Sequence, residues 1–122
     1  MIKETVVWMK RIKQTIAKDN FELVYQPIVS LSDGSVHHYA ALSRLPEDNG
    51  GSPYKFITMA EQLGNIGEFD FAVFKRVARI IRTGDPGPDA SIAVNLSGHS
   101  LSTPGFVETL IAFLKTDLRI RN

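Results

Sequence analysis

Apolar residues recur every three or four positions in the first segment of the chain. In residues 4–18, ETVVWMKRIKQTIAK, Trp8, Ile12 and Ile16 lie four residues apart, and basic side chains occupy the other face. This spacing predicts an amphipathic helix within residues 1–20. Its basic character leaves binding to a membrane surface or a partner open, but packing on its own domain, or a connection to an upstream domain, is the favoured interpretation.

The pattern then changes to one typical of β-strands. The segment FELVYQPIVSL is rich in β-branched and aromatic residues, and SDGS supplies an Asp-Gly turn before VHHYAALSRL. These features predict a β-hairpin. Pro27 cannot donate a hydrogen bond to a sheet, so we expect the first strand to lie at a sheet edge or to hold Pro27 at an end or irregularity.

Two helices are predicted after the hairpin. Ser52 is expected to cap the first, with Pro53 as its first residue and Gly64 as its stop. The second follows in EFDFAVFKRVARIIRTG, where apolar residues recur at helical spacing before Gly84.

A strand and a helix close the pattern. ASIAVNLS is a nearly continuous apolar run that turns polar at Asn95 and Ser97, as expected for a buried strand whose carboxyl end reaches a site. Thr103 is expected to cap a last helix that Pro104 opens. Strands alternating with helices predict an α/β fold with parallel pairing. Three strands leave sheet edges unpaired, so we expect a larger barrel or sheet, or completion by another chain.

Composition narrows the function classes. The 122 residues are 43% hydrophobic and 22% charged, typical of one globular domain. A net charge of +1 gives no general reason to bind nucleic acid. The chain has no cysteine, which excludes thiol chemistry and suits a cytoplasmic location. No apolar run approaches the roughly 20 residues of a membrane span.

Three segments, in order, carry a family resemblance: FELVYQPIVSLSDGSVHHYAALSRL, PYKFITMAEQLGNIGEFD and IAVNLSGHSL. Together they resemble the amino-terminal half of the EAL family of cyclic di-GMP phosphodiesterases. The resemblance implies a TIM-type (β/α)8 barrel whose first strand is antiparallel, with roughly half of the barrel in residues 21–122. Such barrels take roughly 250 residues, and we expect the ligands supplied by later strands to be missing from this chain.

The family reaction is similar to two-metal phosphodiester hydrolysis with Mg²⁺ or Mn²⁺, which needs converging carboxylates. Ala40 stands where the family signature has its metal-ligating Glu, so the motif reads Ala40-Ala41-Leu42. Asn95 matches the family's ligating Asn and is a weak metal ligand by itself. No catalytic residue and no cofactor are therefore expected for this chain.

The resemblance also implies nucleotide contacts that need no metal. Arg44 matches an arginine that approaches a phosphate, Leu42 a residue near the bases, and Gln26 a polar lining residue. Asn95 is the fourth expected ligand-binding residue, in addition to its weak match to a metal ligand. Three of the four have a plainer interpretation: Leu42 as barrel packing, Arg44 in an ion pair with Glu47 or Asp48, and Asn95 in a turn.

Other polar residues are weaker candidates. His37 and His38 are adjacent on a strand, so they are expected to face opposite sides and to form no ligand pair. His99 is expected in a loop or at a helix start. Glu61 and Asp70 are expected on a helix surface or in a cap.

Three functions remain open for cyclic di-GMP signalling. The favoured one is a degenerate or truncated EAL protein without hydrolytic activity that acts by protein association, as a homo-oligomer formed through the open barrel edge. The alternatives are a metal-independent cyclic di-GMP receptor and a fragment of an active phosphodiesterase.

Overall fold

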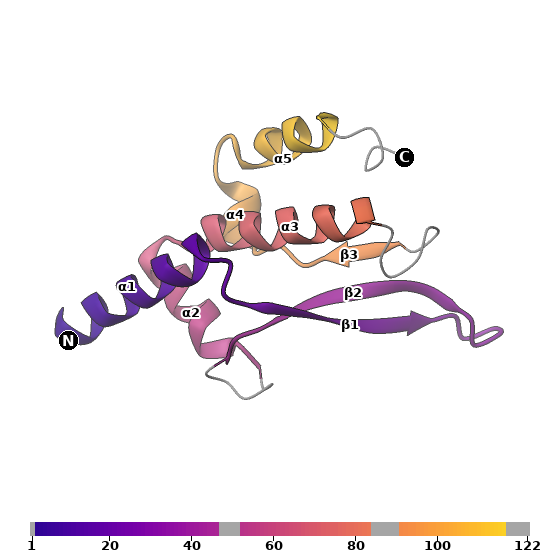
Figure 1. Ribbon diagram of the computed structural model, residues 1–122, viewed down its shortest axis with the longest axis horizontal. Coiled ribbons are helices and arrows are strands. Elements are labelled where there is room, and N and C mark those ends of the chain that lie inside the picture. Colours follow the sequence, from indigo (N-terminus) through magenta and orange to yellow (C-terminus); the bar gives the residue numbers. More distant parts are fainter. Residues whose placement is uncertain (1, 47–51, 84–90, 117–122) are drawn as a thin grey trace.

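The computed structural model describes residues 2–46, 52–83 and 91–116. Five helices and three strands alternate along these ranges (Figure 1). In chain order they are α1 (Ile2–Ala17), β1 (Glu22–Val29), β2 (Val36–Arg44), α2 (Tyr54–Leu63), α3 (Ile66–Thr83), β3 (Ile92–Val94), α4 (Gly98–Ser102) and α5 (Phe106–Lys115). The predicted α/β class is confirmed.

The strands form one open, mixed sheet in the order β1-β2-β3. β1 pairs with β2 antiparallel, and β2 pairs with β3 parallel. The hairpin and the antiparallel first strand are thus as predicted. Pro27 of β1 pairs with Tyr39 of β2, and β1 is an edge strand of this sheet. Because Pro27 has no N–H, it fits a position whose N–H side faces no neighbouring strand.

The hairpin turn is held by its own polar groups. The Ser30 amide donates to the Ser35 carbonyl at 2.8 Å, and Gly34 adopts a left-handed φ of 75°. The Asp33 carboxylate accepts hydrogen bonds from the Ser35 amide at 3.0 Å and from the Ser35 hydroxyl at 2.7 Å. The predicted Asp-Gly turn is therefore present within a loop that spans residues 30–35.

Two predicted helix caps are wrong. Pro53 itself is the N-cap of α2, with φ −81° and ψ 27°, and no side chain caps that end, so Ser52 does not. Gly105 is the N-cap of α5, where its left-handed φ of 84° redirects the chain. Thr103 instead ends the short helix α4, which the sequence pattern did not predict. Gly64 ends α2 in the left-handed conformation, as predicted, whereas Gly84 lies outside the described residues.

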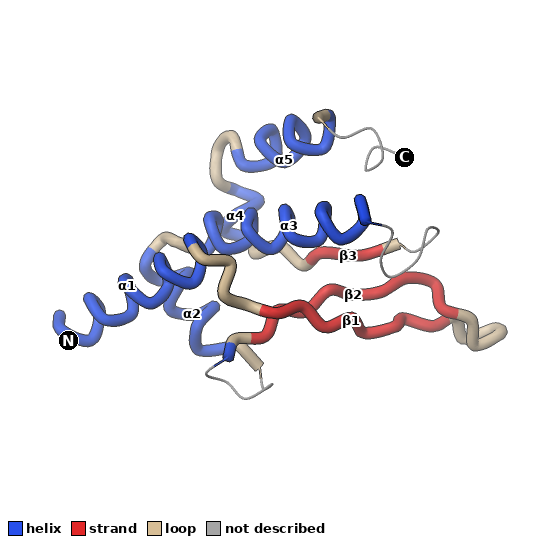
Figure 2. The backbone as a smooth tube through the Cα atoms, viewed as in Figure 1, coloured by secondary structure: helices blue, strands red, loops and turns tan. Residues whose placement is uncertain are grey.

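The buried apolar cluster lies where α1, α2 and α3 meet beside one end of the sheet. Figure 2 shows how these three helices are arranged beside the strands. Trp8 and Ile12 of α1 belong to it, together with Phe56 of α2 and Phe69 of α3. The Phe69 ring packs 5.0 Å from the Phe56 ring and 5.5 Å from the Phe21 ring, measured between centroids. The apolar face of α1 is therefore used for packing on its own chain.

Arg76 fixes the connection between α1 and β1. Its guanidinium donates to the Asp19 carbonyl at 2.6 Å and to the Phe21 carbonyl at 3.0 Å, and it lies 4.5 Å from the centre of the Phe21 ring. Because this side chain comes from the middle of α3, it ties the start of the sheet to the helix layer.

Candidate functional site

Three of the four predicted contact residues come together at the carboxyl end of β2. Leu42, Arg44 and Asn95 line one pocket of about 310 Å³, which the start of α2 and the side of α3 also border. β2 and β3 are parallel neighbours, so their carboxyl ends meet at the same edge of the sheet. In open α/β sheets, ligands bind at that edge.

The strand register shows which side chains share a face. Ala40 lies opposite Gln26 on β1 and opposite Ala93 on β3. Side chains alternate along a strand, so Leu42 and Arg44 lie on the Ala40 face. Gln26 is on this face as well, one strand away from the pocket. The structure places Leu42, Arg44 and Asn95 in the lining of one pocket and Gln26 outside that lining, and ligand binding by these residues stays a prediction.

Arg44 is half-buried and turns back on the strand that carries it. Its guanidinium donates to the Ser43 carbonyl at 2.8 Å, which leaves further N–H donors for a ligand. The alternative ion pair with Glu47 or Asp48 lies outside the described residues.

A buried carboxylate supports the loop after β3. Asp70 is 7% exposed, and one of its oxygens accepts hydrogen bonds from the Ser97 amide at 2.9 Å and the Ser100 hydroxyl at 2.6 Å. The Ser97 hydroxyl in turn accepts from the Ser100 amide at 3.0 Å, which caps α4. Asp70 therefore orders the turn that follows Asn95. The sequence indicates a capping role as one possibility, but it does not identify Ser97 and Ser100 as the partners.

The residues present do not fit a pair of hard divalent cations. Ala40 offers a methyl group, Asn95 a neutral amide, and one oxygen of Asp70 already accepts two hydrogen bonds. Within the described ranges, no group of three or more His, Cys, Asp or Glu side chains could hold a metal ion. Mg²⁺ and Mn²⁺ require several oxygen ligands that converge on one point, which this set does not supply.

The prediction that His37 and His38 face opposite sides is wrong. Their Nδ1 atoms lie 2.9 Å apart. Ile28 pairs with His38 while Val29 pairs with Val36, so His37 is an extra residue in β2. Such a β-bulge breaks the alternation of side chains, because two residues of one strand oppose one of the other. The shift depends on pairing with β1 and is invisible in β2 alone.

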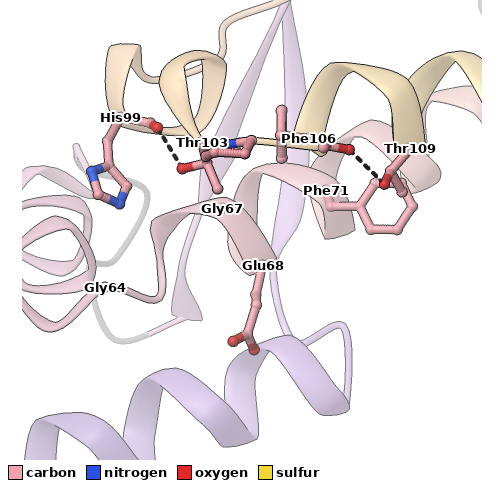
Figure 3. Close-up of a pocket in the computed structure, with 10 residues that line it drawn as sticks. Gly64, Gly67, Glu68, Phe71, His99, Thr103, Phe106 and Thr109 are labelled. Carbon is pink, nitrogen blue, oxygen red and sulfur yellow. Dashed lines mark hydrogen bonds between the residues drawn. The ribbon is translucent and has the colours of Figure 1, made fainter.

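A second pocket lies on the helix side of the molecule (Figure 3). It measures about 430 Å³ and lies between the start of α3 and the α4–α5 connection. Figure 3 shows the Glu68 carboxylate directed away from the His99 imidazole. The hydroxyl of Thr103 donates a hydrogen bond to the His99 carbonyl, and the hydroxyl of Thr109 donates one to the Gly105 carbonyl. None of the four predicted contact residues lines this pocket. Among the described residues, its lining includes no arginine, whereas Arg44 lines the strand-end pocket.

Comparison with known proteins identifies the family. The EAL domain model matches residues 9–121. The chain therefore belongs to the EAL domain family, which confirms the resemblance drawn from its three motif segments.

Curated relatives are bacterial. The chain is 38% identical over 92 residues to the cyclic di-GMP phosphodiesterase NbdA of Pseudomonas aeruginosa, covering 74% of this chain and 10% of that protein. It is 30% identical over 119 residues to the probable cyclic di-GMP phosphodiesterase PdeI of Escherichia coli strain K12, covering 92% of this chain and 15% of that protein. The chain thus spans only a small part of the length of these relatives.

Solved structures share the fold. The S helix-GGDEF-EAL structure of Vibrio cholerae LapD matches with a TM-score of 0.82 and 26% identity, over 97% of this chain and 29% of that one. The Xanthomonas citri FimX EAL domain in complex with c-diGMP matches with a TM-score of 0.73 and 27% identity, over 93% of this chain and 45% of that one. The open sheet therefore corresponds to part of an EAL domain. Across the described ranges, no helix is long and apolar enough to cross a membrane.

Proposed function

We propose that this chain is a noncatalytic EAL module of cyclic di-GMP signalling that acts by associating with another copy of itself. The observation that carries the proposal is the open face of the sheet, which holds Val24, Ile28, Ala40, Leu42 and Ala93 and also the polar Gln26 and Arg44. Val24 and Ile28 are 42% and 37% exposed, although they are large apolar residues of β1.

A second copy is the occupant that the charges allow. The net charge of +1 leaves almost no repulsion between two identical chains. At the far edge of the sheet, β3 pairs with β2 on one side and, among the described strands, with none on the other. Free strand edges beside an apolar face are templates for pairing with another chain.

The absence of hydrolysis is proposed from the donor set. The methyl group of Ala40 cannot ligate a metal, and Asn95 is an auxiliary ligand at best. Chromatography of cyclic di-GMP incubated with the chain and Mg²⁺ or Mn²⁺ tests this directly. We expect no linear dinucleotide from the chain or from Ala40→Glu. Turnover by the unaltered chain would show instead that it is part of an active phosphodiesterase, and turnover by Ala40→Glu alone would show that one carboxylate suffices.

A second candidate function is a metal-independent receptor for cyclic di-GMP. The pocket that gathers Leu42, Arg44 and Asn95 favours it, since a guanidinium can donate two parallel hydrogen bonds to a phosphate. The LapD and FimX neighbours include structures described as bound to c-di-GMP.

Calorimetric titration separates the two functions. Cyclic di-GMP is titrated into the chain and into Arg44→Ala, each with and without Mg²⁺, with Arg82→Ala as a control for loss of a positive charge on α3. Binding that needs no metal and falls at least tenfold in Arg44→Ala alone supports the receptor. If no titration shows binding of cyclic di-GMP, the receptor function is contradicted and the association proposal is kept.

A further inference from the structure

The imidazoles of His37 and His38 converge at the start of β2. Their Nδ1 atoms are 2.9 Å apart, and the ring centroids lie 5.1 Å apart with the planes at 81°. The bulge opposite Ile28 and Val29 produces this arrangement, because it inserts His37 without a partner in the ladder. Both side chains are accessible to solvent: His37 is exposed and His38 is half-buried.

Two nitrogen atoms at this separation can serve one proton or one metal ion. In a neutral imidazole one nitrogen carries the proton and the other has a lone pair, so one ring of the pair donates from Nδ1 and the other accepts. A zinc ion binds imidazole nitrogen at about 2.0–2.1 Å, so two nitrogens at a tetrahedral angle lie about 3.3–3.4 Å apart. Opening the pair by about half an ångström, a small change in side-chain torsion, would admit the ion.

We propose that the Nδ1 atoms of His37 and His38 form a binding site for a divalent transition-metal ion of intermediate softness, such as zinc or copper. Imidazole nitrogen suits these metals and not Mg²⁺ or Ca²⁺. When both rings are neutral, the donating ring passes from its Nδ1–H to its Nε2–H tautomer, so that each Nδ1 presents a lone pair to the ion. Water completes the coordination.

The site is separate from the strand-end pocket. His38 and Arg44 are six residues apart on one strand, which places them about 20 Å from each other at about 3.3 Å per residue. The pair therefore belongs to the opposite end of β2 from Arg44. The proposal does not depend on nucleotide binding, hydrolysis or association.

Zinc titration by calorimetry tests the site on the untagged full chain, because a polyhistidine tag would bind the same metals. ZnCl₂ is titrated into the chain, His37→Ala, His38→Ala and His99→Ala, and MgCl₂ into the chain. His99 is the matched control, since it is the remaining histidine and lies on α4. We expect one saturable zinc site per chain, at least tenfold weaker in each of the first two variants and unchanged in His99→Ala, with no binding of Mg²⁺. Copper is expected to bind more tightly than zinc.

Three results would overturn the proposal. They are no saturable zinc binding by the unaltered chain, retention of full affinity when His37 or His38 is replaced, and an equal loss in His99→Ala. In the first case the pair is a hydrogen bond only. Far-UV circular dichroism checks each variant, and His37→Phe and His38→Phe, which keep a ring of similar shape without a ligating nitrogen, replace any alanine variant that loses its helical signal.

Discussion

The two ends of this molecule differ in how completely they bury their apolar residues. Where α1, α2 and α3 meet, Phe56 is 2% exposed and packs against Phe69. On the open sheet face, Val24 and Ile28 keep more than a third of their surface in water. The first region is complete within the described chain, whereas the second has the apolar character of a surface that is covered by something else. The folded core and the proposed association surface therefore rest on different residues.

The largest expected effect lies in the complete region. Phe56→Ala removes a fully buried ring and should cost about 3–5 kcal/mol in the free energy of unfolding. Tyr54→Ala, two residues earlier on the same helix and 74% exposed, is the control and should change it by less than about 0.5 kcal/mol. Urea denaturation measures both. Equal losses in the two variants would mean that this end is not the stabilising core.

The next effect concerns the buried carboxylate of α3. Asp70→Ala leaves the Ser97 amide and the buried Ser100 hydroxyl without their acceptor and should cost about 2–3 kcal/mol. Glu68→Ala, an exposed acid on the same helix, should cost under about 0.5 kcal/mol. If Asp70→Ala unfolds at the same urea concentration as Glu68→Ala, the carboxylate does not hold the loop after β3.

A smaller effect is expected on the open face. Val24→Glu places a charge where a second copy is proposed to pack and should weaken self-association at least tenfold, because burying that charge is costly. Leu31→Glu introduces the same charge in the hairpin turn, at a fully exposed residue. Sedimentation velocity across a concentration series compares them. Equal association by both variants would place the interface elsewhere than on this face.

The smallest effect is at the hairpin turn. The Ser35 amide, followed by the Ser35 hydroxyl, lowers the pKa of Asp33 below its ordinary value of 3.8. A lowered folded-state pKa stabilises the fold above the unfolded-state pKa, and this contribution is lost as the pH falls through the folded-state value. NMR titration should find the pKa of Asp33 below 3.8, with much of the shift kept in Ser35→Ala because the amide remains. A value at or above 3.8 would contradict the turn geometry.

Local sequence rules predicted the elements whose signals are local. The hairpin follows from its strand composition and Asp-Gly turn, and the end of α2 follows from Gly64, which supplies the left-handed conformation. The sequence also indicated that Leu42, Arg44 and Asn95 belong together, because strand alternation and the family motifs placed them at one site; in the structure they line one pocket.

The features that were missed depend on distant partners. Helix α4 is held by Asp70, which precedes Ser97 by 27 residues. The pairing of His37 with His38 depends on the register that β2 adopts against β1. The wrong cap at Ser52 shows the same limit, because a suitable side chain at a helix start does not ensure that it accepts the hydrogen bond. For α4 and for the histidine pair, contacts with other elements decided between the local alternatives.

Multi-angle light scattering after gel filtration measures whether two copies associate through the open face. The unaltered chain is measured from micromolar to hundreds of micromolar concentration beside Val24→Glu. We expect a mass above that of one chain that rises with concentration and that falls toward the monomer in the variant. A well-folded monomer at every concentration would contradict it.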